Sequence, residues 1–110
     1  MGGKYKNTLQ KGRVRYIVFK EGNKWYAVAL EFNIVEAGDD PREVLLSLFE
    51  AIRGYVKSAI KIKARPHILN QRADNEYEKL WGKLQENKNT PSRNYLPPVY
   101  TFGERPLAIM

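Results

Sequence analysis

The pattern of apolar and polar residues predicts two β-strands near the start of the chain. The first, Arg13 to Lys20, is rich in β-branched and aromatic residues. The second, Trp25 to Phe32, has one wholly apolar face, which we expect to meet the core. Its other face is small and mixed, as in a sheet that is open to solvent or to a partner. The apolar face consists of Tyr26, Val28, Leu30 and Phe32, and the mixed face of Trp25, Ala27, Ala29 and Glu31.

A short third strand, Ile34 to Ala37, completes an antiparallel meander, and the spacing then becomes helical over residues 41–59. Asp40 is placed to cap this helix, Pro41 stands at its first position, and Glu43 follows three residues after the cap. Apolar residues recur at intervals of three and four, so one side of the helix is predicted to cover the sheet. This stripe consists of Leu45, Leu48, Phe49, Ile52, Val56 and Ala59.

The pattern is less regular after the main helix. Lys61 to Lys63 is predicted as a fourth, edge strand, and residues 75–86 as a second helix with a face to bury. Residues 87–98 form a polar and Pro-rich linker, and Val99 to Phe102 alternates again as a strand-like tail. The apolar face of the second helix consists of Tyr77, Leu80, Trp81 and Leu84.

Together these elements predict an α+β fold. We expect a three- to four-stranded antiparallel sheet with one long helix packed on one face, a second C-terminal helix and a strand-like tail. The expected organisation is a sheet-plus-helix domain over residues 1–66 and a C-terminal extension over residues 67–110. A chain of 110 residues is long enough to bury one core.

Charge is distributed unevenly along the chain, whose formal net charge is +7. Residues 26–56 carry six carboxylates and two arginines, whereas residues 1–25 carry seven cations and one carboxylate. Residues 57–72 carry five cations and no carboxylate. An acidic middle is thus flanked by two basic blocks. The chain has no Cys and no apolar run of membrane-spanning length, which favours a cytoplasmic protein without disulfides or thiolate metal sites.

The sequence offers little for catalysis. His67 is the only histidine, and the first strand holds no carboxylate. A two-metal nuclease site needs several converging carboxylates, and Glu31, Glu36 and Asp39 stand on strand ends and turns where solvated acids are ordinary. We therefore expect no catalytic residues, no metal site and no cofactor, and a protein that is not an enzyme.

The run from Tyr16 to Ala59 resembles the HicB antitoxin family. The resemblance rests on three motifs in the order that the family shows. They are Trp25-Tyr26-Ala27-Val28-Ala29-Leu30-Glu31, Gly38-Asp39-Asp40-Pro41-Arg42-Glu43 and Phe49-Glu50-Ala51-Ile52. Family members commonly have Gly-Asp-Thr at the second motif, and Asp40 here takes the place of the Thr.

The resemblance implies a partial ribonuclease-H-like fold without nuclease activity. It also implies a partner, because HicB proteins bind and block HicA, a small cytosolic toxin that cleaves mRNA. Since a ribonuclease needs a basic surface, we expect Glu31, Glu36 and Asp39 in the acidic middle to face a HicA-like toxin. Many HicB proteins also carry a C-terminal DNA-binding module, and residues 70–110 contain no second helix at helix-turn-helix spacing.

Two further questions stay open at this point. The alternative function is a nucleic-acid-binding regulator that uses the basic blocks at residues 4–24 and 57–72, with Tyr5 and Tyr16 placed to stack on bases. The tail strand is expected to pair with the sheet edge of another copy, giving a homo-oligomer, or else to fold back on its own sheet. The tail residues are Val99, Tyr100, Thr101 and Phe102.

Overall fold

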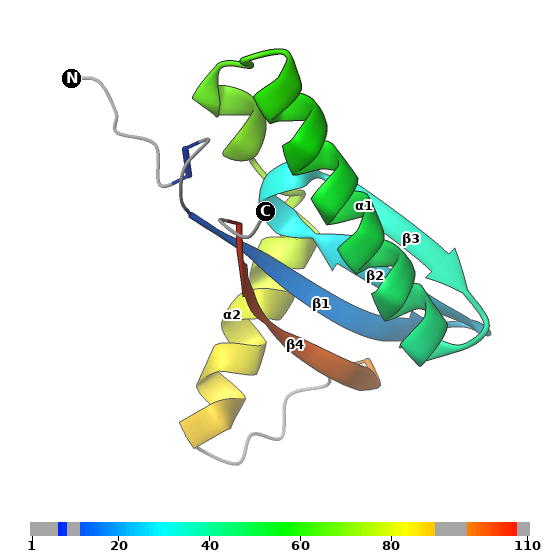
Figure 1. Cartoon of the computed structure of the whole chain (residues 1–110). Coiled ribbons are helices and arrows are strands. Elements are labelled where there is room, and N and C mark those ends of the chain that lie inside the picture. Colours follow the sequence, from blue (N-terminus) through cyan, green and yellow to red (C-terminus); the bar gives the residue numbers. More distant parts are fainter. Residues whose placement is uncertain (1–6, 9–11, 90–96, 108–110) are drawn as a thin grey trace.

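The computed structural model describes residues 7, 8, 12–89 and 97–107 (Figure 1). Four strands form one antiparallel sheet in the order β3-β2-β1-β4. The predicted α+β class is confirmed. The strands are β1 (Arg13–Glu21), β2 (Lys24–Ala29), β3 (Ile34–Gly38) and β4 (Val99–Pro106), and the helices are α1 (Pro41–Lys61) and α2 (Asn75–Asn89).

Both faces of the sheet are covered, one by each helix, so the molecule has three layers (Figure 1). On one side, Val14 and Val18 of β1 and Ala27 of β2 pack against α1. On the other side, Ile17 of β1 and Val28 of β2 pack against α2. Burial of apolar area at about 25 cal/mol per Å² therefore stabilises both interfaces.

This arrangement corrects the expected use of β2. The small face with Ala27 and Ala29 is not open, because α1 packs on it, and the apolar face with Val28 and Leu30 lies under α2. Small residues on the first face let the long helix approach the sheet closely. The face with Val28 and Leu30 is covered by the amphipathic face of α2, through Leu80 and Leu84.

The start of α1 is built as its sequence predicts. The Asp40 side chain accepts a hydrogen bond of 2.9 Å from the Arg42 backbone N–H, and Pro41 occupies the first turn. Of the predicted apolar stripe, Leu48, Ile52, Val56 and Ala59 are buried, while Leu45 and Phe49 are partly buried. Val44 is also buried, although the stripe did not include it.

The expected edge strand over Lys61–Lys63 is wrong. Helical hydrogen bonding continues past Lys61, since the Ile62 N–H donates to the Ser58 carbonyl at 3.1 Å. Lys63 then takes a left-handed conformation, with φ of 52°, which turns the chain away from the helix axis. The fourth strand of the sheet is instead β4.

β4 pairs with β1 of its own chain, and it extends to Pro106, four residues beyond the predicted end of the tail strand. Gly103 lies opposite Tyr16 in this pairing, and a Cβ at position 103 would come within 3.1 Å of the Tyr16 hydroxyl. A glycine here gives the Tyr16 ring room to reach Phe49 of α1, at 5.2 Å between ring centroids. β4 is thus an edge strand that is held by its pairing with the central strand β1. Within the described ranges, no helix has the length and apolarity needed to cross a bilayer.

Replacement of the helix cap tests the local account of α1. Asp40→Ala removes the acceptor for the Arg42 N–H and is expected to lower the free energy of unfolding by about 0.5–2 kcal/mol. Asp39→Ala is the matched control, because Asp39 is an adjacent exposed acid outside the cap. Urea melts of both variants measure the difference, and equal losses would contradict the capping role.

Candidate protein-interaction surface

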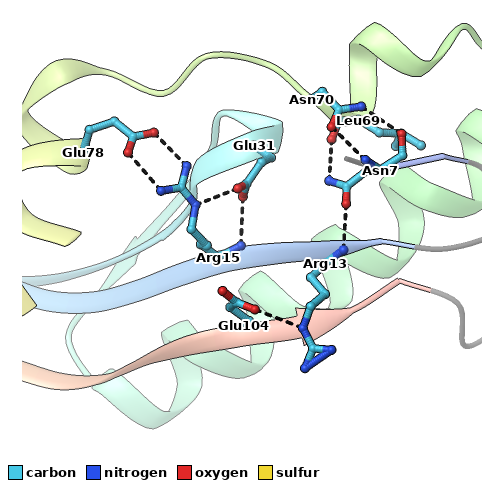
Figure 2. Close-up of polar contacts among 8 residues, drawn as sticks. All are labelled: Asn7, Arg13, Arg15, Glu31, Leu69, Asn70, Glu78 and Glu104. Atoms are coloured by element: carbon cyan, nitrogen blue, oxygen red, sulfur yellow. Dashed lines mark hydrogen bonds and ion pairs between the residues drawn. The ribbon is translucent and has the colours of Figure 1, made fainter. Parts of the chain in front are cut away.

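The three acids predicted to contact a partner do not lie together on one surface. Glu31 is in η1, a 3-10 turn (Leu30–Phe32) between β2 and β3, and it is 8% exposed. Its carboxylate accepts a hydrogen bond from the Arg15 backbone N–H at 2.8 Å and one from the Arg15 side-chain Nε at 2.6 Å (Figure 2). Glu31 is therefore occupied within the fold and is not available to a partner.

Arg15 joins Glu31 to the second helix. The two terminal nitrogens of its guanidinium donate to the Glu78 carboxylate of α2 at 2.9 and 2.7 Å (Figure 2). The same guanidinium lies 5.5 Å from the centroid of the Trp81 ring. We call Arg15, Glu31 and Glu78 the Arg15 brace, because they tie β1 to both η1 and α2. The hydrogen bonds to Glu78, and then those to Glu31, raise the pKa of Arg15 above its usual value, against the lowering effect of burial.

A second buried polar side chain, Asn7, connects the segment before β1 to the turn at Leu69 and Asn70. Its side-chain amide donates to the Leu69 carbonyl at 2.8 Å and accepts from the Arg13 N–H at 2.7 Å (Figure 2). Asn70 completes the contact by accepting from the Asn7 N–H and donating to the Asn7 carbonyl, each at 2.9 Å. These bonds satisfy the buried amide of Asn7, which indicates a structural role.

Glu36 and Asp39, unlike Glu31, lie toward the outside. Glu36 is on the edge strand β3 and is half-buried, and the Asp39 side chain is 91% exposed, with Lys24 at 3.9 Å. An ion pair this exposed contributes little to stability, so it does not bind Asp39 firmly to its own chain. Both acids remain available to a partner.

More acids follow directly along the chain and extend this region onto α1. Glu43 and Glu50 are exposed on α1, and between them at helical spacing stands Leu46, which is 58% exposed. The sequence analysis missed Leu46, although its place between two acids at intervals of three and four residues was a readable signal. We call this set the acidic surface; it comprises Glu36, Asp39, Asp40, Glu43, Leu46 and Glu50. One exposed cation, Arg42, stands among its five carboxylates, so the set stays acidic overall.

The cations of the first basic block that the structure describes have partners within the fold. Arg13 pairs with Glu104 at 3.0 Å, Arg15 belongs to the brace, and Lys20 lies 5.9 Å from the centroid of the Trp25 ring. Of the two aromatic residues proposed to stack on bases, Tyr5 lies outside the described residues, and Tyr16 packs against α1. The second block is more open, since Lys57 and Lys61 are exposed.

The predicted tail residues differ in how far they remain available. Val99 and Phe102 pack in the cluster beneath α2, where the Phe102 ring meets Trp81 edge to face at 5.8 Å. Thr101 pairs with Val18 of β1, and Tyr100 is exposed beside Trp25. An oligomer contact through this strand therefore has to use its outer edge and Tyr100.

The described residues hold no cluster of three His, Asp or Glu side chains that is close enough to bind a metal ion. His67 is exposed in the short turn η2 (Pro66–Leu69). Searches of protein-family models, of curated proteins and of solved structures find no match to this chain. The fold and its contacts are thus the basis for a functional proposal.

The Arg15 brace makes a testable contribution to stability. Arg15→Met leaves the Glu31 carboxylate buried without its cation and is expected to cost about 3 kcal/mol of unfolding free energy. This value is at the low end for a buried pair, since the Arg15 side chain keeps 21% of its exposure. Denaturant melts give the measurement.

Arg13→Met is the matched control on the same strand. Its ion pair with Glu104 is exposed, so the loss should stay within about 0.5 kcal/mol. The double variant Arg15→Met with Glu31→Gln should recover part of the loss, because it removes the unpaired charge and keeps an acceptor for the Arg15 backbone N–H. Equal melts for Arg15→Met and Arg13→Met would show that the brace does not stabilise the fold.

Proposed function

We propose that this chain is a HicB-like antitoxin: a protein without catalysis of its own that binds and inhibits a HicA-type ribonuclease toxin. The observation that carries the proposal is the acidic surface, in which Glu43 and Glu50 precede and follow the exposed apolar side chain of Leu46 along α1, on a chain of net positive charge. Acidic groups steer a basic partner to this region, and an apolar centre gives the contact its affinity.

The residues that carry the HicB resemblance have defined places in the fold. The motif from Trp25 to Glu31 runs along β2 into η1, and the motif from Gly38 to Glu43 forms the connection from β3 into α1, with Asp40 as its cap. These motifs mainly specify a strand and a helix start. They support the proposal through the common order of elements, and the acidic surface supplies the argument for the partner.

Inhibition by covering is the mechanism that suits this surface. A ribonuclease toxin binds RNA phosphates through cations, and carboxylates placed opposite those cations occupy the same positions. Binding of the antitoxin then competes directly with RNA. Glu31 has no part in this contact, because its carboxylate is held by Arg15.

The alternative, a nucleic-acid-binding regulator, has weaker support. Of its first block, Arg13 and Arg15 are paired with carboxylates within the fold. Lys4, Lys6 and Lys11 lie outside the described residues. The exposed cations of α1 remain, and they are treated separately below.

Charge reversal on the acidic surface is expected to slow binding to the toxin. Glu36→Lys with Asp39→Lys should lower the association rate with a HicA-type ribonuclease. The decrease should be largest at low salt and should shrink as the ionic strength rises, because steering is screened. Stopped-flow or surface-based kinetics at several salt concentrations measure it.

Glu76→Lys on α2 is the control, since this exposed acid lies outside the acidic surface. In an RNA-cleavage assay the parent protein should suppress the toxin, whereas alone with Mg²⁺ or Mn²⁺ it should leave RNA intact. An association rate that falls as much per reversed charge with Glu76→Lys, or metal-dependent RNA cleavage by the chain alone, would contradict the proposal.

We also propose self-association through the outer edge of β4. The Leu107 N–H donates to the Gly12 carbonyl at 2.9 Å, and bonded pairs alternate along an antiparallel ladder. The N–H groups of Phe102 and Glu104 therefore point outward, where they can donate hydrogen bonds to the backbone carbonyls of a strand from a second copy. Pro106 falls at one of these outward positions, so its missing N–H costs no bond to β1.

Glu104→Pro tests this edge, because it removes an outward N–H without breaking the ladder with β1. It should lower the oligomer mass seen by light scattering. Glu104→Ala also removes the ion pair with Arg13 but keeps the N–H, and it should leave the mass unchanged. The same mass for the parent and both variants would exclude an edge-paired oligomer, provided that thermal melts show Glu104→Pro to be folded.

A further inference from the structure

A groove lies between the second half of α1 and the end of β4. Its volume is about 390 Å³, within the range of sites that hold small ligands or a few side chains of a partner. It is lined by Ile52, Arg53, Val56, Lys57, Arg105, Pro106 and Leu107. We call it the cationic groove, because all its ionisable lining residues are cations.

These cations carry charge that the fold does not neutralise. Among the described residues, Arg53, Lys57 and Arg105 form no salt bridge. Arg105 instead lies 4.0 Å from the centroid of the Phe49 ring, which holds its guanidinium beside α1. Arg53 and Lys57 are exposed, and Lys61 continues the row one turn further along the helix.

The floor of the groove is apolar. Ile52, Val56 and Leu107 belong to the core on the α1 side of the sheet and present their edges to the groove. Ile60, which is 42% exposed, adds apolar surface one turn beyond Val56. An occupant that matches this site therefore needs carboxylates for the cationic rim and an apolar side chain for the floor.

We propose that the cationic groove docks an acidic segment of a partner protein, in which carboxylates flank an apolar anchor. The occupant is distinct from the HicA-type toxin, because a basic ribonuclease is repelled by the groove and attracted by the acidic surface on the other half of α1. A nucleic acid matches less well, since its phosphates leave the apolar floor uncovered. Arg105 also covers the Phe49 ring on which a base would otherwise stack.

Fluorescence anisotropy with a labelled peptide that repeats Leu-Glu-Glu tests the docking chemistry on the full chain. The peptide should bind, and the matched Leu-Gln-Gln and Ser-Glu-Glu peptides should bind more weakly, because each lacks one of the two required features. Arg53→Glu with Lys57→Glu should weaken binding of Leu-Glu-Glu by about tenfold or more.

The control is Lys79→Glu with Lys83→Glu, which reverses two exposed cations at the same spacing on α2. If both double variants weakened peptide binding equally, net charge alone would explain the effect, and the proposal would be overturned. Thermal melts of each variant confirm that it is folded.

Three other results would also overturn the proposal. In the first, binding of a labelled single-stranded RNA depends on Arg53 and Lys57, whereas binding of the peptide does not. The second is a fall in oligomer mass on groove reversal, which would make a second copy the occupant. The third is peptide binding that appears only after residues 108–110 are removed, which would assign the groove to the chain's own terminus. None of these readouts requires the toxin, so they are independent of the proposed antitoxin function.

Discussion

The fold depends on β1 being held between two helical layers. Its alternate side chains enter two separate cores, and Arg15 lies at the place where the strand, η1 and α2 meet. Without the Arg15 side chain, the Glu31 carboxylate would be buried without a cation and Glu78 of α2 would lose its ion pair with β1. Apolar packing of Leu80 and Leu84, with ring contacts of Tyr77 and Trp81, also attaches α2 to the sheet.

Because both faces of the sheet are covered, the described residues offer a partner the sheet edges, the connecting turns and the outer sides of the helices. α1 is the element that matters most here, since its two halves carry opposite charge. The first half, with Glu43 and Glu50, forms part of the acidic surface, and the second half, with Arg53 and Lys57, lines the cationic groove. The order of charges also agrees with the helix macrodipole, so stability alone accounts for part of it. The dipole does not explain the exposed Leu46 or the groove beside β4, and these two features support the proposed binding of partner proteins.

Local sequence patterns predicted the elements well and their tertiary use less well. The positions of the strands, the Asp40 cap and the apolar stripe of α1 follow from the order of neighbouring residues, and they were predicted. The second strand is shorter than predicted, because Leu30–Phe32 forms the 3-10 turn η1 and does not continue the strand to Phe32. Which helix covers which face of β2 depends on contacts between distant segments. The prediction that the face with Ala27 and Ala29 is open to solvent or a partner was therefore wrong. Glu31 was read as a surface acid because its cation, Arg15, stands sixteen residues earlier, and no local pattern joins the two. The prediction of an edge strand over Lys61–Lys63 was wrong because helical hydrogen bonding of α1 continues to Ile62.

The central claim is that this chain binds a basic toxin through the edge strand β3 and the first half of α1. Hydrogen–deuterium exchange of the chain, alone and in complex with the HicA-type protein, tests this claim most directly. The account predicts slower exchange over residues 34–50 in the complex and unchanged exchange over α2 (Asn75–Asn89). Slower exchange concentrated on α2 or along the cationic groove, with residues 34–50 unchanged, would contradict it.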